Sequence, residues 1–221
     1  NAWLKEDKDQ IFEAVRRTEG GFHGFNMTVV ALLREWVSQR ARDLASGLME
    51  VEALSSDELL DLGQSAIVLK KQGKLEEAKG MLERVLIALE RVYGFEHPET
   101  MTAVHNLGII SRMQGNLDEA KVLYERALAG YILTLGPEDP FVFSTMNSLA
   151  NVLLGQGKLR EAQMLYEQAL IGRERTLGSM DRHTLLSMNS LGNLLMSQGK
   201  LEEAKVLYER ALAGHEKSLG P

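Results

Sequence analysis

The hydrophobic and polar positions of this chain follow a helical spacing that recurs along the sequence. In three segments, apolar or small residues lie three to four positions apart, so they share one face of a helix. The stripe comprises Val104, Leu107, Gly108 and Ser111, then Met146, Leu149, Ala150 and Leu153, and finally Met188, Leu191, Gly192 and Leu195. Equivalent members lie 42 residues apart. The pattern predicts amphipathic helices that pack in a regular series.

A longer phrase repeats with the same period. A glycine stands at positions 73, 115, 157 and 199, and a Leu-Xaa-Glu-Ala sequence follows each of them from positions 75, 117, 159 and 201. Successive copies are all 42 residues apart, and no insertion changes the register. Such self-similarity is typical of arrays in which one structural unit stacks on the next.

Each repeat reads as two helices joined by a glycine turn. In the second repeat His97 and Pro98 stand where a capping residue and the first helical residue are expected, and the first helix runs to about Met113. A turn at residues 114–116 follows, and the second helix runs from Leu117 to about Leu135, before Gly136 and a proline. We expect four such units, over residues 57–98, 99–140, 141–182 and 183–221.

Small residues recur where the two helices of a unit should meet. Gly108, Ala150 and Gly192 keep one position of the first helix nearly bare, which allows the second helix of the same unit to approach closely. Alanines at 120, 162 and 204 lie opposite, on the second helix. The tyrosines at 124, 166 and 208 are expected to fill the space between units as core residues.

Residues 1–56 form a lead-in with a different pattern. Trp3–Thr18 predicts a short amphipathic helix, three glycines between positions 20 and 24 predict a turn, and the apolar spacing from Met27 to about Leu54 predicts a long helix. The long helix is expected to pack on the first repeat as an N-terminal cap, which terminal units of arrays require. A coiled-coil or subunit-docking helix is the alternative.

The repeated residues resemble a known family. Leu107-Gly108, Gly115, Ala120, Tyr124 and Ala127 resemble the tetratricopeptide repeat signature, whose usual period is 34. The period of 42 and the His/Asp-Pro start resemble the repeats of kinesin light chain and its relatives. The resemblance covers residues 57–221 and implies an all-α, right-handed α-α superhelix (a TPR solenoid) behind N-terminal capping helices. It also implies a concave groove, lined by the first helix of each unit, that binds extended partner segments.

The residues expected to line that groove lie beside the core stripe, at intervals that keep them on one helix face. The candidate partner-binding residues are Lys70, Thr102, His105, Arg112, Asn147, Asn151, Asn189 and Asn193. A carboxamide offers both a donor and an acceptor, which suits the backbone of an extended peptide. The resemblance supports this interpretation, because kinesin light chain repeats carry an Asn-Asn-Leu-Ala stretch that is partly matched at Asn147–Ala150 and Asn189–Gly192.

Both sets of candidate residues have a structural alternative. Asparagine competes for backbone hydrogen bonds, so the four asparagines could bond neighbouring carbonyls or face water. Lys70, Lys71 and Arg112 could form a basic lip for an acidic segment or a C-terminal carboxylate, but basic residues at a helix C-terminus also favour the helix dipole.

Composition and charge narrow the function classes. The chain of 221 residues is 44% hydrophobic and 25% charged with a net charge of −6, so non-specific attraction to nucleic acid or anionic membranes is not expected. No run of about 18 apolar residues predicts a membrane span. The chain has no cysteine, and its five histidines are scattered without ligand spacing. We expect no metal, no cofactor, no catalytic residues and no enzymatic role.

Three functions remain open at this point. The first is a cytoplasmic protein-interaction scaffold or adaptor that binds a partner peptide or segment in the groove. The second is a constitutive subunit of a large assembly, docked through its outer helices or the long lead-in helix. The third is the sensor array of a larger signalling NTPase.

Overall fold

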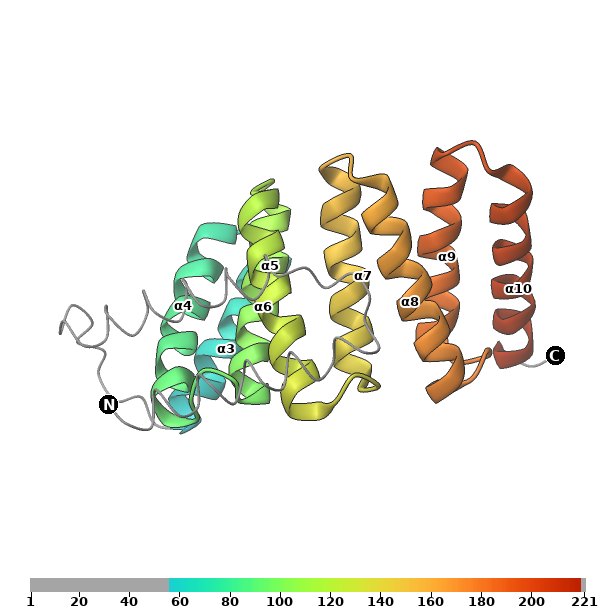
Figure 1. The fold of residues 1–221 in the computed structure, drawn as a ribbon. Helices are drawn as coiled ribbons and strands as arrows, with labels where there is room; N and C mark the ends of the chain where they lie inside the picture. Colours follow the sequence, from blue (N-terminus) through green and yellow to red (C-terminus); the bar gives the residue numbers. More distant parts are fainter. Residues whose placement is uncertain (1–55, 220–221) are drawn as a thin grey trace.

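The computed structural model describes residues 56–219. The two helices and the glycine turn predicted within residues 1–54 lie outside the described residues. The described residues form eight helices and no strand, in the order α3 (Ser56–Lys71), α4 (Leu75–Val92), α5 (Pro98–Met113), α6 (Leu117–Leu135), α7 (Pro140–Gly155), α8 (Leu159–Leu177), α9 (Arg182–Ser197) and α10 (Leu201–Leu219) (Figure 1). The predicted ends of the helices in the second repeat are confirmed.

Local sequence explains where the helices begin and end. The Asp139 side chain accepts a hydrogen bond from the backbone N–H of Phe141 at 2.8 Å, and Pro140 occupies the first helical turn, where its missing N–H costs nothing. His97 caps α5 in the same way through its Nδ1. Gly115 has φ +83°, a conformation that other residues rarely adopt, and it turns the chain from α5 into α6.

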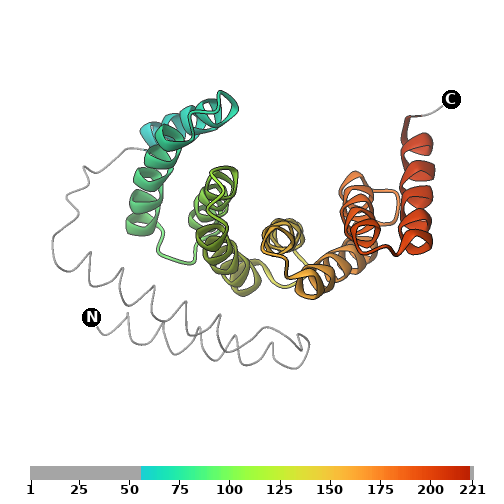
Figure 2. The same ribbon diagram turned by 90° about the horizontal axis from the view of Figure 1, so that it is seen from above.

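The helix pairs stack into a curved array. Each helix contacts the next one along the chain, and α7 also contacts α5 and α9. Seen from above, the pairs follow an arc with α5, α7 and α9 on its inner side and α6 and α8 on its outer side (Figure 2). The described chain is therefore an all-α superhelical repeat fold, and we call the inner side of the arc the concave face.

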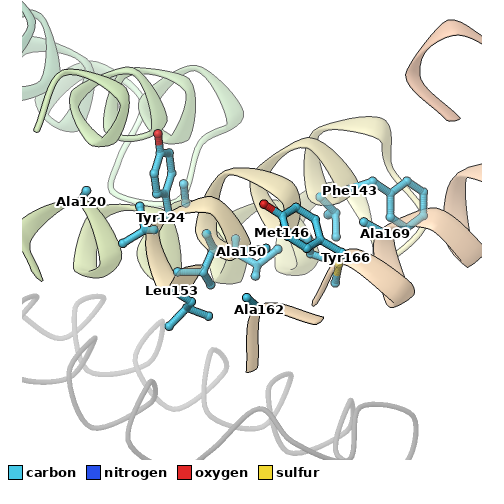
Figure 3. Close-up of a cluster of buried hydrophobic side chains, with 14 of the residues drawn as sticks. Ala120, Tyr124, Phe143, Met146, Ala150, Leu153, Ala162, Tyr166 and Ala169 are labelled. Atoms are coloured by element: carbon cyan, nitrogen blue, oxygen red, sulfur yellow. The ribbon is translucent and has the colours of Figure 1, made fainter. Parts of the chain in front are cut away.

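The core runs continuously through the array and repeats every 42 residues. Ala120 and Ala162 are fully buried at the crossing of the two helices of a unit, near Tyr124 and Tyr166 (Figure 3). Leu128 is 0% exposed, whereas Leu212, two periods later, is 59% exposed. The difference arises because α6 is followed by another helix pair, and no further pair follows α10 among the described residues.

Small residues, glycine or alanine, allow close approach at two places in each unit. A Cβ on Gly108 would lie 2.9 Å from the Tyr124 ring, which confirms that the small residue lets the helices of one unit meet. A Cβ on Gly172 would lie 2.2 Å from the Phe143 ring, so α7 and α8 also require glycine at that contact. The Tyr124 ring lies against Gly108 of its own unit, and its hydroxyl also interacts with Ser148 of the next unit, so the expectation that the tyrosines fill the space between units stays a prediction.

Candidate partner-binding face

The eight candidate residues lie on α3, α5, α7 and α9, the first helices of the four pairs. Three of these helices line the concave face (Figure 2). The side chains of Arg112, Asn151 and Asn193 are exposed, and the other five are half-buried. The candidates therefore lie on equivalent helices but differ in how exposed each side chain is.

Two of the asparagines bind the repeated tyrosines. The Tyr166 hydroxyl donates to Oδ1 of Asn151 at 2.8 Å, and the Tyr208 hydroxyl donates to Oδ1 of Asn193 at 2.6 Å. Asn151 also donates to the backbone carbonyl of Asn147 at 2.9 Å. Tyr166 is 1% exposed, and a buried tyrosine needs a partner for its hydroxyl, so the amide of Asn151 has a structural role. The amide nitrogen of Asn193 has no hydrogen-bond partner among the residues that the structure describes.

The other two asparagines differ from each other. Asn147 donates from Nδ2 to the Ser187 hydroxyl of the next unit at 3.0 Å, and its Oδ1 is buried without a hydrogen-bond partner. Asn189 is half-buried, and its side chain makes no hydrogen bond to the residues that the structure describes. Among the four asparagines, most of the amide atoms that have no hydrogen bond to the described residues therefore belong to Asn189 and Asn193 on α9.

His105 links two units at the centre of the face. Its Nε2 lies 3.2 Å from the Ser148 hydroxyl on α7, and its ring meets the Tyr124 ring edge-on with centroids 5.2 Å apart. Burial lowers the pKa of His105 to about 4, and the positive charge of Lys70 acts in the same direction. His105 is consequently neutral at pH 7.

The basic residues at this end of the face are Lys70 and Arg112. Burial raises the pKa of the Tyr124 hydroxyl, while the charge of Arg112 and a hydrogen bond to it act in the opposite direction. Burial also raises the pKa of Tyr166 to about 12, and the Arg112 charge again opposes the shift. Arg112 therefore lies near both hydroxyls. Thr102 has less to offer a partner, because its hydroxyl bonds the Pro98 carbonyl and lies 2.9 Å from the Tyr131 hydroxyl.

One arginine that sequence reasoning overlooked lies between the inner helices. Arg173 projects from α8, is 4% exposed, and donates to the hydroxyls of Ser144 on α7 and Ser187 on α9. The residues at the same register position of the other units are Leu89, Tyr131 and His215. The sequence did contain a signal for it, because the other units have leucine, tyrosine or histidine at this register position.

The side chains described on this face are suited to hydrogen bonding. No group of three or more His, Cys, Asp or Glu residues that could hold a metal ion occurs within residues 56–219. Within the same range, none of the helices combines the length and apolar character needed to span a bilayer. The first helices of the pairs present carboxamides, hydroxyls and two basic side chains, together with exposed apolar residues such as Leu186 and Met196.

Comparison with known proteins places the chain among repeat proteins. The family model described as tetratricopeptide repeat matches residues 60–132, 105–175 and 141–217. No curated protein matches the chain. A crystal structure of the Podosopora anserina "putative kinesin light chain nearly identical TPR-like repeats" has 25% identity and a TM-score of 0.63, covering 96% of this chain and 95% of that one.

Two further solved structures share the fold. A crystal structure of the same Podosopora anserina repeats with a methionine substituted for one glutamine has 24% identity and a TM-score of 0.66, with 96% of this chain and 95% of that chain covered. BtubC (BKLC) from P. vanneervenii has 20% identity and a TM-score of 0.68, with 98% of this chain and 91% of that chain covered. These likenesses extend over most of each chain.

Proposed function

Since this chain belongs to the tetratricopeptide repeat family, we propose that it is a non-catalytic scaffold or adaptor that binds an extended segment of a partner protein along its concave face. Repeat solenoids expose long curved surfaces because each unit contacts only its neighbours, and such surfaces suit extended ligands. A cytoplasmic location stays a prediction from the sequence.

The observation that carries this proposal is that side-chain amide atoms on α9 have no hydrogen-bond partner among the described residues. Asn189 makes no hydrogen bond within the described residues, and exposed Asn193 keeps its amide nitrogen free while its oxygen accepts from Tyr208. An extended peptide has alternating N–H and C=O groups that need partners when it leaves water. Amide side chains along a helix can meet both kinds of group.

The side chains around the amides indicate what kind of segment would fit. Leu186 and Met196, on the same stripe of α9, are 46% and 51% exposed. Lys70 and Arg112 supply positive charge toward the other end of the array. A complementary segment would place an apolar side chain on Leu186 and Met196 and acidic residues near Lys70 and Arg112.

The proposal can be tested with peptides selected from a random 15-residue phage library on the chain. Each selected peptide is synthesised and its affinity measured by calorimetry for the wild type and for the Asn189→Ala, Asn193→Ala double variant. Loss of two hydrogen bonds should weaken binding roughly tenfold, since each net hydrogen bond contributes about 0.5–1.5 kcal/mol.

A control variant tests whether the effect belongs to the concave face. Lys205→Ala removes a side chain on α10 that is 65% exposed, and it should leave the affinity within about twofold of wild type, as surface changes away from an interface do. Equal affinities for the wild type and the asparagine double variant would contradict binding at this face. Circular dichroism confirms that the variants remain helical.

A constitutive structural subunit is the second candidate, and a repeated apolar position favours it. Val122, Met164 and Val206 lie 42 residues apart on α6, α8 and α10 and are 37%, 49% and 54% exposed. Exposed apolar side chains in line can mark a docking surface. A stoichiometric complex from native extract that survives the asparagine changes but is lost with Met164→Glu would support this function instead.

A further inference from the structure

Arg173 is a buried positive charge with no carboxylate beside it among the residues that the structure describes. Its guanidinium donates to the Ser187 hydroxyl at 2.6 Å, the Ser144 hydroxyl at 2.9 Å and the His183 carbonyl at 3.1 Å, and its Nε is buried without a partner. No Asp or Glu oxygen within residues 56–219 forms an ion pair with it. Asp181 is the acidic residue whose charge acts on it from farther away.

The polar groups around Arg173 are rich in donors. The Ser187 hydroxyl oxygen accepts from both Arg173 and the Nδ2 of Asn147, and the Ser144 oxygen accepts from Arg173. Three N–H donors thus converge on two hydroxyls, with a full positive charge behind them. Buried charges in proteins are ordinarily paired, because an isolated one is costly to remove from water.

The same chain shows how a buried arginine is paired elsewhere. Arg126 on α6 is as buried as Arg173, and its Nη2 lies 2.8 Å from Oε1 of Glu90, which is itself buried on α4. The repeat fold can therefore supply a carboxylate to a buried arginine. At Arg173 the described part of the chain supplies only neutral acceptors.

The repeat register shows that the packing does not require an arginine here. One period earlier the position is Tyr131, which is fully buried and whose hydroxyl lies 2.9 Å from that of Thr102. Thr102 is the period-related partner of Ser144. The second unit thus has the neutral pair of Tyr131 and Thr102 at this position. The third unit has the charged Arg173, bonded to two serines, instead.

We propose that Arg173, with Ser144, Asn147 and Ser187, forms an anion subsite between α7 and α9 that takes an aspartate or glutamate carboxylate of the bound segment. Ser144 and Asn147 are half-buried on the concave face, so a carboxylate there can reach the guanidinium by displacing a serine hydroxyl. The identity of the carboxylate rests on the proposed function, whereas the subsite itself does not.

The subsite is tested directly with acetate as the probe. The Nε–H signal of Arg173 is followed by NMR while sodium acetate replaces sodium chloride at constant ionic strength. The signal is assigned by its loss in the Arg173→Tyr, Ser144→Thr variant, which restores the pair found in the second unit. A second variant, Arg173→His, carries the residue found at the period-related position of α10 and provides the assignment if the first does not fold.

Acetate should move the Arg173 signal along a saturating curve, and the signal of Arg126, already paired with Glu90, should move less than a tenth as far. A response to acetate no larger than that to chloride would overturn the subsite. A response to inorganic phosphate without one to acetate would overturn the assignment to a carboxylate.

Peptides selected on the wild type give the second measurement. At one position they should carry Asp or Glu, and replacing this residue by Gln or Asn should weaken binding roughly tenfold to the wild type but less than twofold to the Tyr/Thr variant. Peptides that bind without any acidic preference would overturn the inference and leave the proposed function standing. Conversely, an acetate response with no selectable peptide would leave the subsite and remove the proposed function.

Discussion

At the scale of single residues, some exposed side chains of the concave face also form hydrogen bonds within the protein. Asn151 uses both ends of its amide within the protein, on Tyr166 and on the Asn147 carbonyl, although its side chain is exposed. Asn193 uses only its oxygen, on Tyr208. Sequence position therefore does not show which of these asparagines can bind a partner. That depends on whether the amide keeps an atom without a hydrogen bond to the described residues, as Asn193 does and Asn151 does not.

His105 provides a residue-scale prediction about pH. Its pKa is about 4 in the folded chain against an ordinary value of 6.5, so the unfolded chain takes up the proton first as the pH falls. Stability should therefore be lost between pH 6.5 and 4, by on the order of 1–3 kcal/mol for this group. The measurement is urea unfolding across that range for the wild type and for His105→Asn, which stays neutral throughout.

The comparison isolates His105 because every other titrating group is common to both proteins. The wild type should lose stability more steeply than the variant below pH 6.5, and the two curves should run parallel above it. Curves that stay parallel down to pH 4 would show that His105 is protonated in the folded chain without cost.

At the scale of helices, the stacking of units depends on leucines at one register position. Leu86, Leu128 and Leu170 are 5%, 0% and 6% exposed on α4, α6 and α8, and Leu212 on α10 is 59% exposed. The side chains share a sequence position and differ only in whether another helix pair follows. The contribution of each leucine to stability should therefore follow from its neighbours.

Alanine substitution at two of these positions tests that idea. Leu128→Ala removes a fully buried side chain and should reduce the free energy of unfolding by about 2–5 kcal/mol. Leu212→Ala, the matched change at the exposed end, should alter it by less than about 0.5 kcal/mol. Chemical denaturation measures both, and equal losses would indicate that Leu212 is buried against something in solution.

At the scale of the whole molecule, the array is held by contacts between sequential helices, so its stability should vary along its length. The pairs α5–α6 and α7–α8 have a neighbour on either side, and α10 has none beyond it among the described residues. Hydrogen exchange followed by mass spectrometry should find the slowest amides in α6 and α7 and faster ones in α10. Equal protection in all helices would instead indicate that the array opens as one cooperative unit.

The fold was largely predictable because its determinants are local and repeated. A capping residue and a turn glycine recur every 42 residues, and each acts within a few residues of itself, as Asp139 does on the N–H of Phe141. The position of the candidate residues on the first helix of each pair was predictable for the same reason, because the repeat assigns them to equivalent helices. The surroundings of the Tyr124 ring were less predictable, because they depend on Gly108 of the partner helix and on Ser148 of the next unit.

The sequence by itself determined the repeat, the helix ends and the side of each helix on which the polar stripe lies. Only the tertiary structure decided which polar atoms on that stripe remain free, because their partners come from distant residues. Tyr166 bonds Asn151 from 15 positions away, and Ser187 bonds Asn147 from 40 positions away. The burial of Arg173 without a carboxylate was decided in the same way, by the helices that meet around it.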